Sequence, residues 1–127
     1  MLHQFTKHYT LEEARALLPR IRAWLQRMAQ LRQDLEQCEK LLEKLRIDGA
    51  DLGGAAVNRS VSTVGELHQL LQEFQEREIQ IKDLERGLID FPAILDGREV
   101  FLCWEQAEAD IDHWHELNAG YAGRQRL

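Results

Sequence analysis

Residues 11–47 read LEEARALLPRIRAWLQRMAQLRQDLEQCEKLLEKLRI, and they carry the longest regular pattern in the chain. Apolar side chains recur there in alternating steps of three and four residues, which is typical of the apolar seam of a coiled-coil helix. The seam consists of Ala14, Leu17, Ile21, Trp24, Met28, Leu31, Leu35, Cys38, Leu42 and Leu45. Thr10 and Glu13 form a capping box at its start. We therefore predict one long helix over 11–47, bent at Pro19.

A second helix is predicted over 63–87, because apolar residues again follow three-four spacing. They are Val64, Leu67, Leu71, Phe74, Ile81, Leu84 and Leu88. Residues 48–62, between the two helices, contain three glycines and three alanines and show neither helical nor strand periodicity, so they are predicted to be a flexible loop. The two helices are expected to pack against each other as an antiparallel hairpin.

After residue 87 the pattern changes to short runs of β-branched and aromatic residues. Asp96-Gly97 separates two such runs and predicts a β-hairpin over 88–104, with Pro92 at an edge or a bulge. In that hairpin Val100, Leu102 and Trp104 would share one face, and Phe101 and Cys103 the other. A short helix over 108–118 and a tail over 119–127 are expected to follow, and residues 1–9 suggest an extended arm or short edge strand.

These elements predict an α+β fold that is predominantly α. It consists of a long, coiled-coil-like antiparallel helical hairpin, a small antiparallel β-hairpin and a short C-terminal helix. The length of 127 residues fits a single domain over 1–127.

Composition restricts the classes of partner. The chain is 44% hydrophobic and 30% charged, with a formal net charge of −6 and its basic residues interspersed with glutamates, so we expect no nucleic-acid partner. No apolar run approaches the roughly 18 residues of a membrane span. Two cysteines at no metal-motif spacing, with no signal-peptide pattern before them, favour a reducing, cytoplasmic location.

Residues near the C-terminus are the candidates for chemistry. Cys103 and His115 offer the softest metal ligands in the chain. In a helix over 108–118, Glu108 and Asp112 would share a face with His115, whereas His113 would point away. Asp90 lies at the start of the β-hairpin. These residues predict a divalent-metal or acid–base site, and the alternative is that Cys103 is a small buried apolar residue and His115 a hydrogen-bonded structural one.

Arg124 follows a Gly-x-x-Gly pattern formed by Gly120 and Gly123. Backbone amides and a guanidinium in this arrangement are able to bind an anion. Because no strand is predicted before it and no helix after it, a clasp between Arg124 and a carboxylate is favoured over a phosphate loop.

Several of these blocks together resemble the bacterial family catalogued as domain of unknown function 2203. The resemblance runs over nearly the whole chain, and the blocks are HYTLEEA at 8–14, LLP at 17–19, KDLERGLIDFP at 82–92, GREVFLCW at 97–104, and WH at 114–115 with Gly120, Gly123 and Arg124. It supports the predicted fold, and it implies no activity, substrate or catalytic residue.

Two functions compete at this point. An oligomeric binding or interaction protein is favoured, because the apolar seam of 11–47 is longer than the second helix can cover, which predicts a homo-oligomer. The alternative is a small-molecule or metal-dependent enzyme whose site lies between the β-hairpin and the C-terminal helix and uses Asp90, Cys103, Glu108 and His115.

Overall fold

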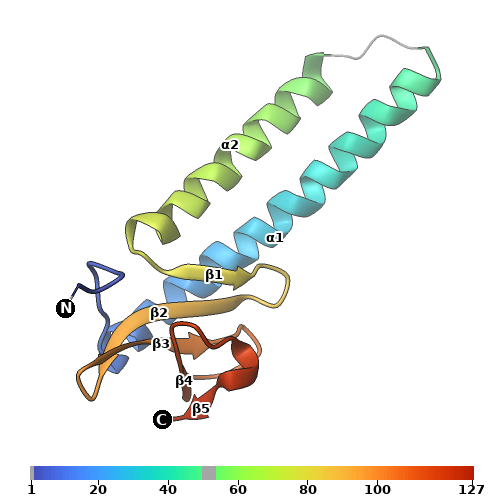
Figure 1. Cartoon of the computed structure of the whole chain (residues 1–127). Coiled ribbons are helices and arrows are strands. Elements are labelled where there is room, and N and C mark those ends of the chain that lie inside the picture. The colour runs from blue at the N-terminus through green and yellow to red at the C-terminus, as the bar shows by residue number, and fades with distance from the viewer. Residues whose placement is uncertain (1, 50–53) are drawn as a thin grey trace. The chain divides into compact units, whose positions relative to one another are not determined.

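The computed structural model describes residues 2–49 and 54–127 (Figure 1). They fall into two compact units, which are considered one at a time. The hairpin unit is Trp24–Gln72, and the sheet unit comprises Met1–Ala23 and Glu73–Leu127. The long helix α1 (Leu11–Ile47) contributes to both, and so does α2 (Gly54–Glu76). No helix of the described ranges is long and apolar enough to cross a membrane.

The hairpin unit contains two antiparallel helices. Arg27, early in α1, forms an ion pair with Glu66, late in α2, and Cys38 shares a small pocket with Ala55 and Ala56 at the start of α2. The predicted apolar seam is the side of α1 that is covered, because none of its ten residues is exposed. The helical hairpin is therefore confirmed, and α1 continues through Pro19, which lies on its exposed side.

The predicted loop over 48–62 is wrong for the part that begins at Gly54, where α2 already starts. Residues 50–53 lie outside the described ranges. Residues 55–62 contain neither glycine nor proline, and alanines have the highest helix propensity. Ser60 and Thr63 donate their hydroxyls to the carbonyls of Val57 and Arg59 in the preceding turn, so these polar residues fit within the helix.

The predicted end of the second helix at residue 87 is also wrong, because α2 ends at Glu76. The Ile79 amide donates to the Phe74 carbonyl and the Glu78 amide to the Gln75 carbonyl, which is the Schellman arrangement. Glu78 occupies the left-handed position of this motif, with φ of 57°. The chain then turns into strand β1 (Gln80–Asp83), so Ile81 and Leu84 continue the helical spacing only by coincidence.

The strands form one antiparallel sheet in the order β1-β2-β3-β4-β5 (Figure 1). The predicted hairpin is confirmed as β2 (Leu88–Leu95) and β3 (Arg98–Trp104). Its turn has positive φ at Asp96 and Gly97, as the Asp-Gly pair predicts. Pro92 lies on β2 beyond the start of β1 at Gln80, where its carbonyl accepts the Tyr9 amide. It therefore removes no hydrogen bond from the β1 ladder.

The predicted C-terminal helix over 108–118 is wrong. His113–Glu116 form strand β4, which pairs with β3, and the helical content of the tail is one 3₁₀ turn at Tyr121–Gly123, followed by β5 (Gln125–Arg126). Residues 105–112 are held instead by polar contacts. The Arg22 guanidinium on α1 donates to the Gln106 and Glu108 carbonyls, and Arg15 pairs with Asp110. These long-range bonds replace the i to i−4 bonds that a helix would make.

Residues 2–10 contain no strand, so the edge strand suggested for this arm is wrong over that range. Two carboxylates anchor the arm. Glu78 accepts the Thr6 and Lys7 amides and the Thr6 hydroxyl, and Glu99 accepts the Gln4 and Phe5 amides at 2.7 and 3.0 Å. The arm is thus fixed by side-chain acceptors in place of a strand partner.

Candidate metal centre

Three neighbouring strands bring Asp90, Cys103 and His115 together on one face of the sheet. Asp90 on β2 lies opposite Cys103 on β3, and Phe101 on β3 lies opposite His115 on β4. Residues directly opposite each other share a face, and so do residues two apart on one strand. His115 therefore reaches Asp90 diagonally across β3, and Cys103 lies directly opposite Asp90 on the same face.

The cluster is buried and tight. Asp90, Cys103 and His115 are 1%, 1% and 2% exposed, and one potential ligand atom from each lies within 4.8 Å of those of the other two. Buried acidic and imidazole groups are rare unless they are paired or bind an ion, so this arrangement requires a chemical explanation.

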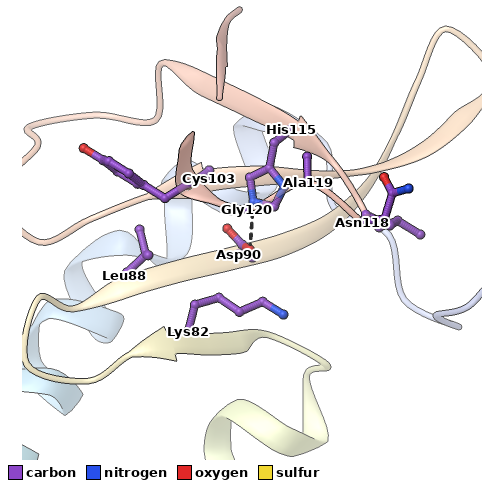
Figure 2. Close-up of a pocket in the computed structure, with 10 residues that line it drawn as sticks. Lys82, Leu88, Asp90, Cys103, His115, Asn118, Ala119 and Gly120 are labelled. Carbon is purple, nitrogen blue, oxygen red and sulfur yellow. Dashed lines mark hydrogen bonds and ion pairs between the residues drawn. The ribbon is translucent and has the colours of Figure 1, made fainter. Parts of the chain in front are cut away.

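The hydrogen bonds of His115 define its tautomer. Its Nδ1 lies 2.7 Å from the Glu116 carbonyl oxygen, and a carbonyl only accepts, so Nδ1 carries a proton. Its Nε2 lies 2.9 Å from Asp90 Oδ2, as Figure 2 shows by a dashed line. In the absence of a cation, one further proton must lie between Nε2 and this oxygen. The pair is then either imidazolium with carboxylate or imidazole with carboxylic acid.

Only one carboxyl oxygen of Asp90, Oδ2, faces His115. Oδ1 is buried and has no hydrogen-bond partner among the described residues. Burial raises the pKa of Asp90. The charge of His115, hydrogen bonds from Cys103 and His115 and the charge of Lys82 act in the opposite direction without cancelling that effect. A buried carboxyl oxygen without a donor is costly, and a bound cation would remove the cost.

Cys103 is not an activated nucleophile in this environment. Burial, followed by the neighbouring charge of Asp90, raises the pKa of the thiol to about 12. The Arg124 guanidinium is 3.9 Å from Sγ and opposes this shift only in part. Catalytic cysteines have lowered pKa values, so the thiol would become a thiolate here only beside an additional cation.

The cluster opens into a pocket of about 250 Å³. Its walls come from β1, β2 and the segment after β4, and Figure 2 shows Lys82, Leu88, Asn118 and Gly120 around the Asp90–His115 pair. Phe101 supports the site from the side, with its ring 5.5 Å from the His115 ring and 5.4 Å from that of Phe5 on the arm.

The other predicted site residues are not members of this ligand cluster, although Arg124 contacts Cys103 Sγ. Asp112 is exposed, and its carbonyl accepts the Leu127 amide. The Glu108 carboxylate binds Arg124 in a bidentate pair at 2.9 and 3.2 Å, so Arg124 forms the clasp that the sequence favoured over an anion site. His113 lies opposite Cys103 on the same sheet face as His115 and is 3.4 Å from Glu108. The expectation that it points away from His115 depended on the helix and is wrong.

Sequence reasoning did not identify Lys82, Phe101 or the segment Leu117–Tyr121 as parts of the site. The pairing of β1 brings Lys82 close to the site, because Gln80 lies opposite Asp90 and Lys82 stands where the register shifts between Ile81 and Asp83. The segment Leu117–Tyr121 has no such signal, because its position depends on β4, which the sequence suggested to be helical.

A second group of potential ligands lies on the arm. His3, His8 and Glu99 have ligand atoms within 4.8 Å of one another, but His3 is exposed and Glu99 already accepts bonds from His8 and two amides. Burial of Glu99 acts to raise its pKa, and these bonds outweigh that effect and lower it to about 2. The group is fully explained as an anchor for the arm.

Comparison with known proteins identifies a family for the chain. No curated protein and no solved structure matches the chain significantly. The family model described as "Uncharacterized conserved protein (DUF2203)" matches residues 7–127, a range that includes the hairpin unit, the sheet unit from residue 7 onward and the whole Asp90–Cys103–His115 cluster. The chain therefore belongs to the DUF2203 family.

Proposed function

We propose that Asp90, Cys103 and His115 bind one divalent transition-metal ion of the zinc class, and that the adjoining pocket binds a small molecule at this ion. The observation that carries the proposal is the buried cluster itself. Three side chains of metal-binding type, from three strands, place their ligand atoms within 4.8 Å of one another at the floor of a pocket.

The orientation of His115 supports metal binding. Histidines that bind metals usually donate their other ring N–H to a carbonyl or carboxylate, and His115 donates Nδ1–H to the Glu116 carbonyl. Nε2 then faces Asp90 and Cys103. One nitrogen, one oxygen and one sulfur suit zinc, whose ligands in a tetrahedral site stand about 3.4 Å apart. The 2.9 Å between Nε2 and Asp90 Oδ2 would have to open slightly.

The charges of the cluster also support metal binding. Asp90 and Cys103 are both acidic groups, and the carboxylate of Asp90 disfavours a thiolate at Cys103. A divalent cation would neutralise both. Three protein ligands would leave a fourth position open, which is the pattern of catalytic and not of structural zinc sites. That position would face the pocket, so the proposed class is a metal-dependent enzyme or small-molecule binding protein.

The test is cobalt substitution of the full chain. Apo-protein loaded with Co²⁺ should bind one equivalent and show thiolate-to-cobalt charge-transfer absorption, because Cys103 would be a ligand. Cys103→Ser should lose that band. Cys38→Ala is the matched control, because Cys38 is the other buried free cysteine and lies in the hairpin unit, so it should keep the band. Wild type without the band, or a band that survives Cys103→Ser, would refute the proposal.

A second function has a separate observation behind it, namely self-association through α2. Val57, Val61 and Val64 are 39%, 66% and 50% exposed and share one side of the helix with Gly65 and His68. That stripe carries no Lys, Arg, Asp or Glu. Two copies would not repel each other there, which supports a second copy of the chain as the partner. The homo-oligomer was first predicted because the apolar seam of α1 was expected to extend beyond the second helix. That argument no longer applies, because α2 begins at Gly54.

Light scattering at micromolar to millimolar concentration tests the self-association. Wild type should dimerise, and Val61→Glu should shift the equilibrium to monomer by placing like charges in the interface. Gln33→Glu, an equal change of charge at an exposed position of α1, should leave the dimer intact. A wild-type monomer over the whole range would exclude this function.

The location remains a proposal too. We propose that the protein works in a reducing, cytoplasmic compartment. Cys38 and Cys103 are both free and buried, and a cysteine-ligated metal requires a thiol that stays reduced.

A further inference from the structure

Lys82 supplies the positive charge of the pocket wall. It stands on β1, lines the pocket beside Asp90, and holds its Nζ 5.0 Å from the centre of the Phe101 ring. Within the described ranges, Nζ has no hydrogen bond and no ion pair. Other basic groups near the pocket are already paired, since Arg86 binds Glu105 and Arg124 binds Glu108.

Arg86 and Arg124 hold Tyr121 in place in another wall of the pocket. Their guanidinium carbons lie 4.2 and 4.3 Å from the centre of the Tyr121 ring, and the Tyr121 hydroxyl donates to Glu105. Tyr121 ends the segment Leu117–Tyr121, which lines the pocket opposite β1. Both arginines already form ion pairs with glutamates in this wall. Among these three basic residues, Lys82 is therefore the one available to pair with a ligand.

The net charge of the metal centre and Lys82 together then favours a ligand with one negative charge. A divalent ion with a carboxylate, a thiolate and a neutral imidazole is neutral overall, and Lys82 leaves one positive charge. We infer that the pocket binds a small organic carboxylate, with one carboxylate oxygen at the open position of the metal and the negative charge facing Lys82. This inference rests on the proposed metal centre.

The size and lining of the pocket agree with such a ligand. A volume of about 250 Å³ equals that of about eight waters at about 30 Å³ each, which suits a carboxylate with a short chain. Leu88 and Leu117 provide apolar wall for that chain. A phosphate dianion would bring more charge than Lys82 balances, and it would leave the apolar wall unused.

The experiment titrates the Co²⁺-loaded full chain with butyrate, with its neutral amide butyramide, and with inorganic phosphate, and follows the cobalt absorption. Butyrate should change the spectrum saturably, and butyramide should not. Lys82→Met should weaken butyrate binding about threefold to fivefold, since a single exposed ion pair contributes up to about 1 kcal/mol. Lys82→Arg should restore the affinity to within about 1.5-fold of wild type, because it keeps the charge.

The outcomes separate the two proposals. Normal cobalt loading with no response to butyrate, equal butyrate affinity in Lys82→Met, or tighter binding of phosphate than of butyrate would each overturn the carboxylate inference and leave the metal centre intact. A chain that shows no thiolate-to-cobalt band would overturn the metal centre, and the carboxylate inference with it.

Discussion

The two units are stabilised by different means. The hairpin unit buries its part of the periodic apolar seam, with Met28, Leu31 and Cys38 at 3% exposure or less. The sheet unit also has an apolar core, but it adds carboxylates and guanidiniums that bind backbone groups across 70 to 95 residues of sequence, as Glu99 binds the Gln4 amide and Arg22 the Glu108 carbonyl. Stability in the hairpin unit should therefore depend on volume, and in the sheet unit on both volume and charge.

The largest effect is expected for Trp104→Ala in the sheet unit. Trp104 is fully buried, donates its indole N–H to the Glu108 carbonyl and lies under the Arg22 guanidinium, so the substitution should lower the free energy of unfolding by about 3 to 5 kcal/mol in urea denaturation. Trp114 is only partly buried, and Trp114→Ala should cost clearly less. Equal losses would show that the core of the sheet does not centre on Trp104.

Met28→Ala tests the seam of the hairpin unit. Met28 is fully buried, and its truncation should cost about 2 to 3 kcal/mol at pH 7 and the same at pH 4, because no titratable group is involved. Leu41 is 48% exposed, and Leu41→Ala should cost less than about 1 kcal/mol. A cost for Met28→Ala that depends strongly on pH would break the contrast between the two units.

Glu99→Gln tests the charged contacts of the sheet unit. The pKa of Glu99 is lowered to about 2, so its contribution is complete above the ordinary glutamate pKa of about 4.3 and is lost as pH falls toward 2. We expect a loss of about 1 to 2 kcal/mol at pH 7, from charge-assisted bonds to two amides and His8. The difference from wild type should shrink steadily below pH 4 in urea denaturation.

The control is Glu39→Gln, at an exposed position of α1 in the hairpin unit, which should change the free energy of unfolding by less than about 0.5 kcal/mol at either pH. If Glu99→Gln had the same small effect as the control, the arm would not be held by charge.

The smallest effect is expected for Gly65→Ala in α2. A methyl group at Gly65 would meet no atom of the described residues within 4 Å, and glycine inside a helix is less favourable than alanine. Thermal denaturation should therefore show a gain of about 0.5 to 1 kcal/mol. A loss would show that this side of α2 is closely covered, as a dimer would cover it, and comparison at low and high protein concentration identifies that case.

The contrast between the units also explains what the sequence could predict. The seam of α1 and the Asp96-Gly97 turn are local patterns, and both structures formed as predicted. The polar contacts that hold residues 105–112 have no local signature, so the sequence does not show that they take the place of the helix predicted over 108–118. Strand β4 forms because the free edge of β3 pairs with it, and pairing depends on tertiary context more than on propensity.

The same limit applies to the site. Asp90, Cys103 and His115 were recognised by residue type, and the structure brings these three together. Glu108 and Asp112 were included only because a helix would have put them beside His115. Lys82 was missed as a pocket residue, because its place follows from the register of β1, a strand that the sequence pattern presented as part of a helix.

The anchoring of the arm has a consequence for biosynthesis. The Phe5 amide binds a carboxylate 94 residues further along the chain, whereas each strand of the sheet pairs with the next one in sequence. During translation the arm leaves the ribosome long before Glu99 does, so Gln4 and Phe5 stay undocked at least until β3 has been made. An arm still accessible to protease would therefore mark a nascent chain whose sheet has not reached β3.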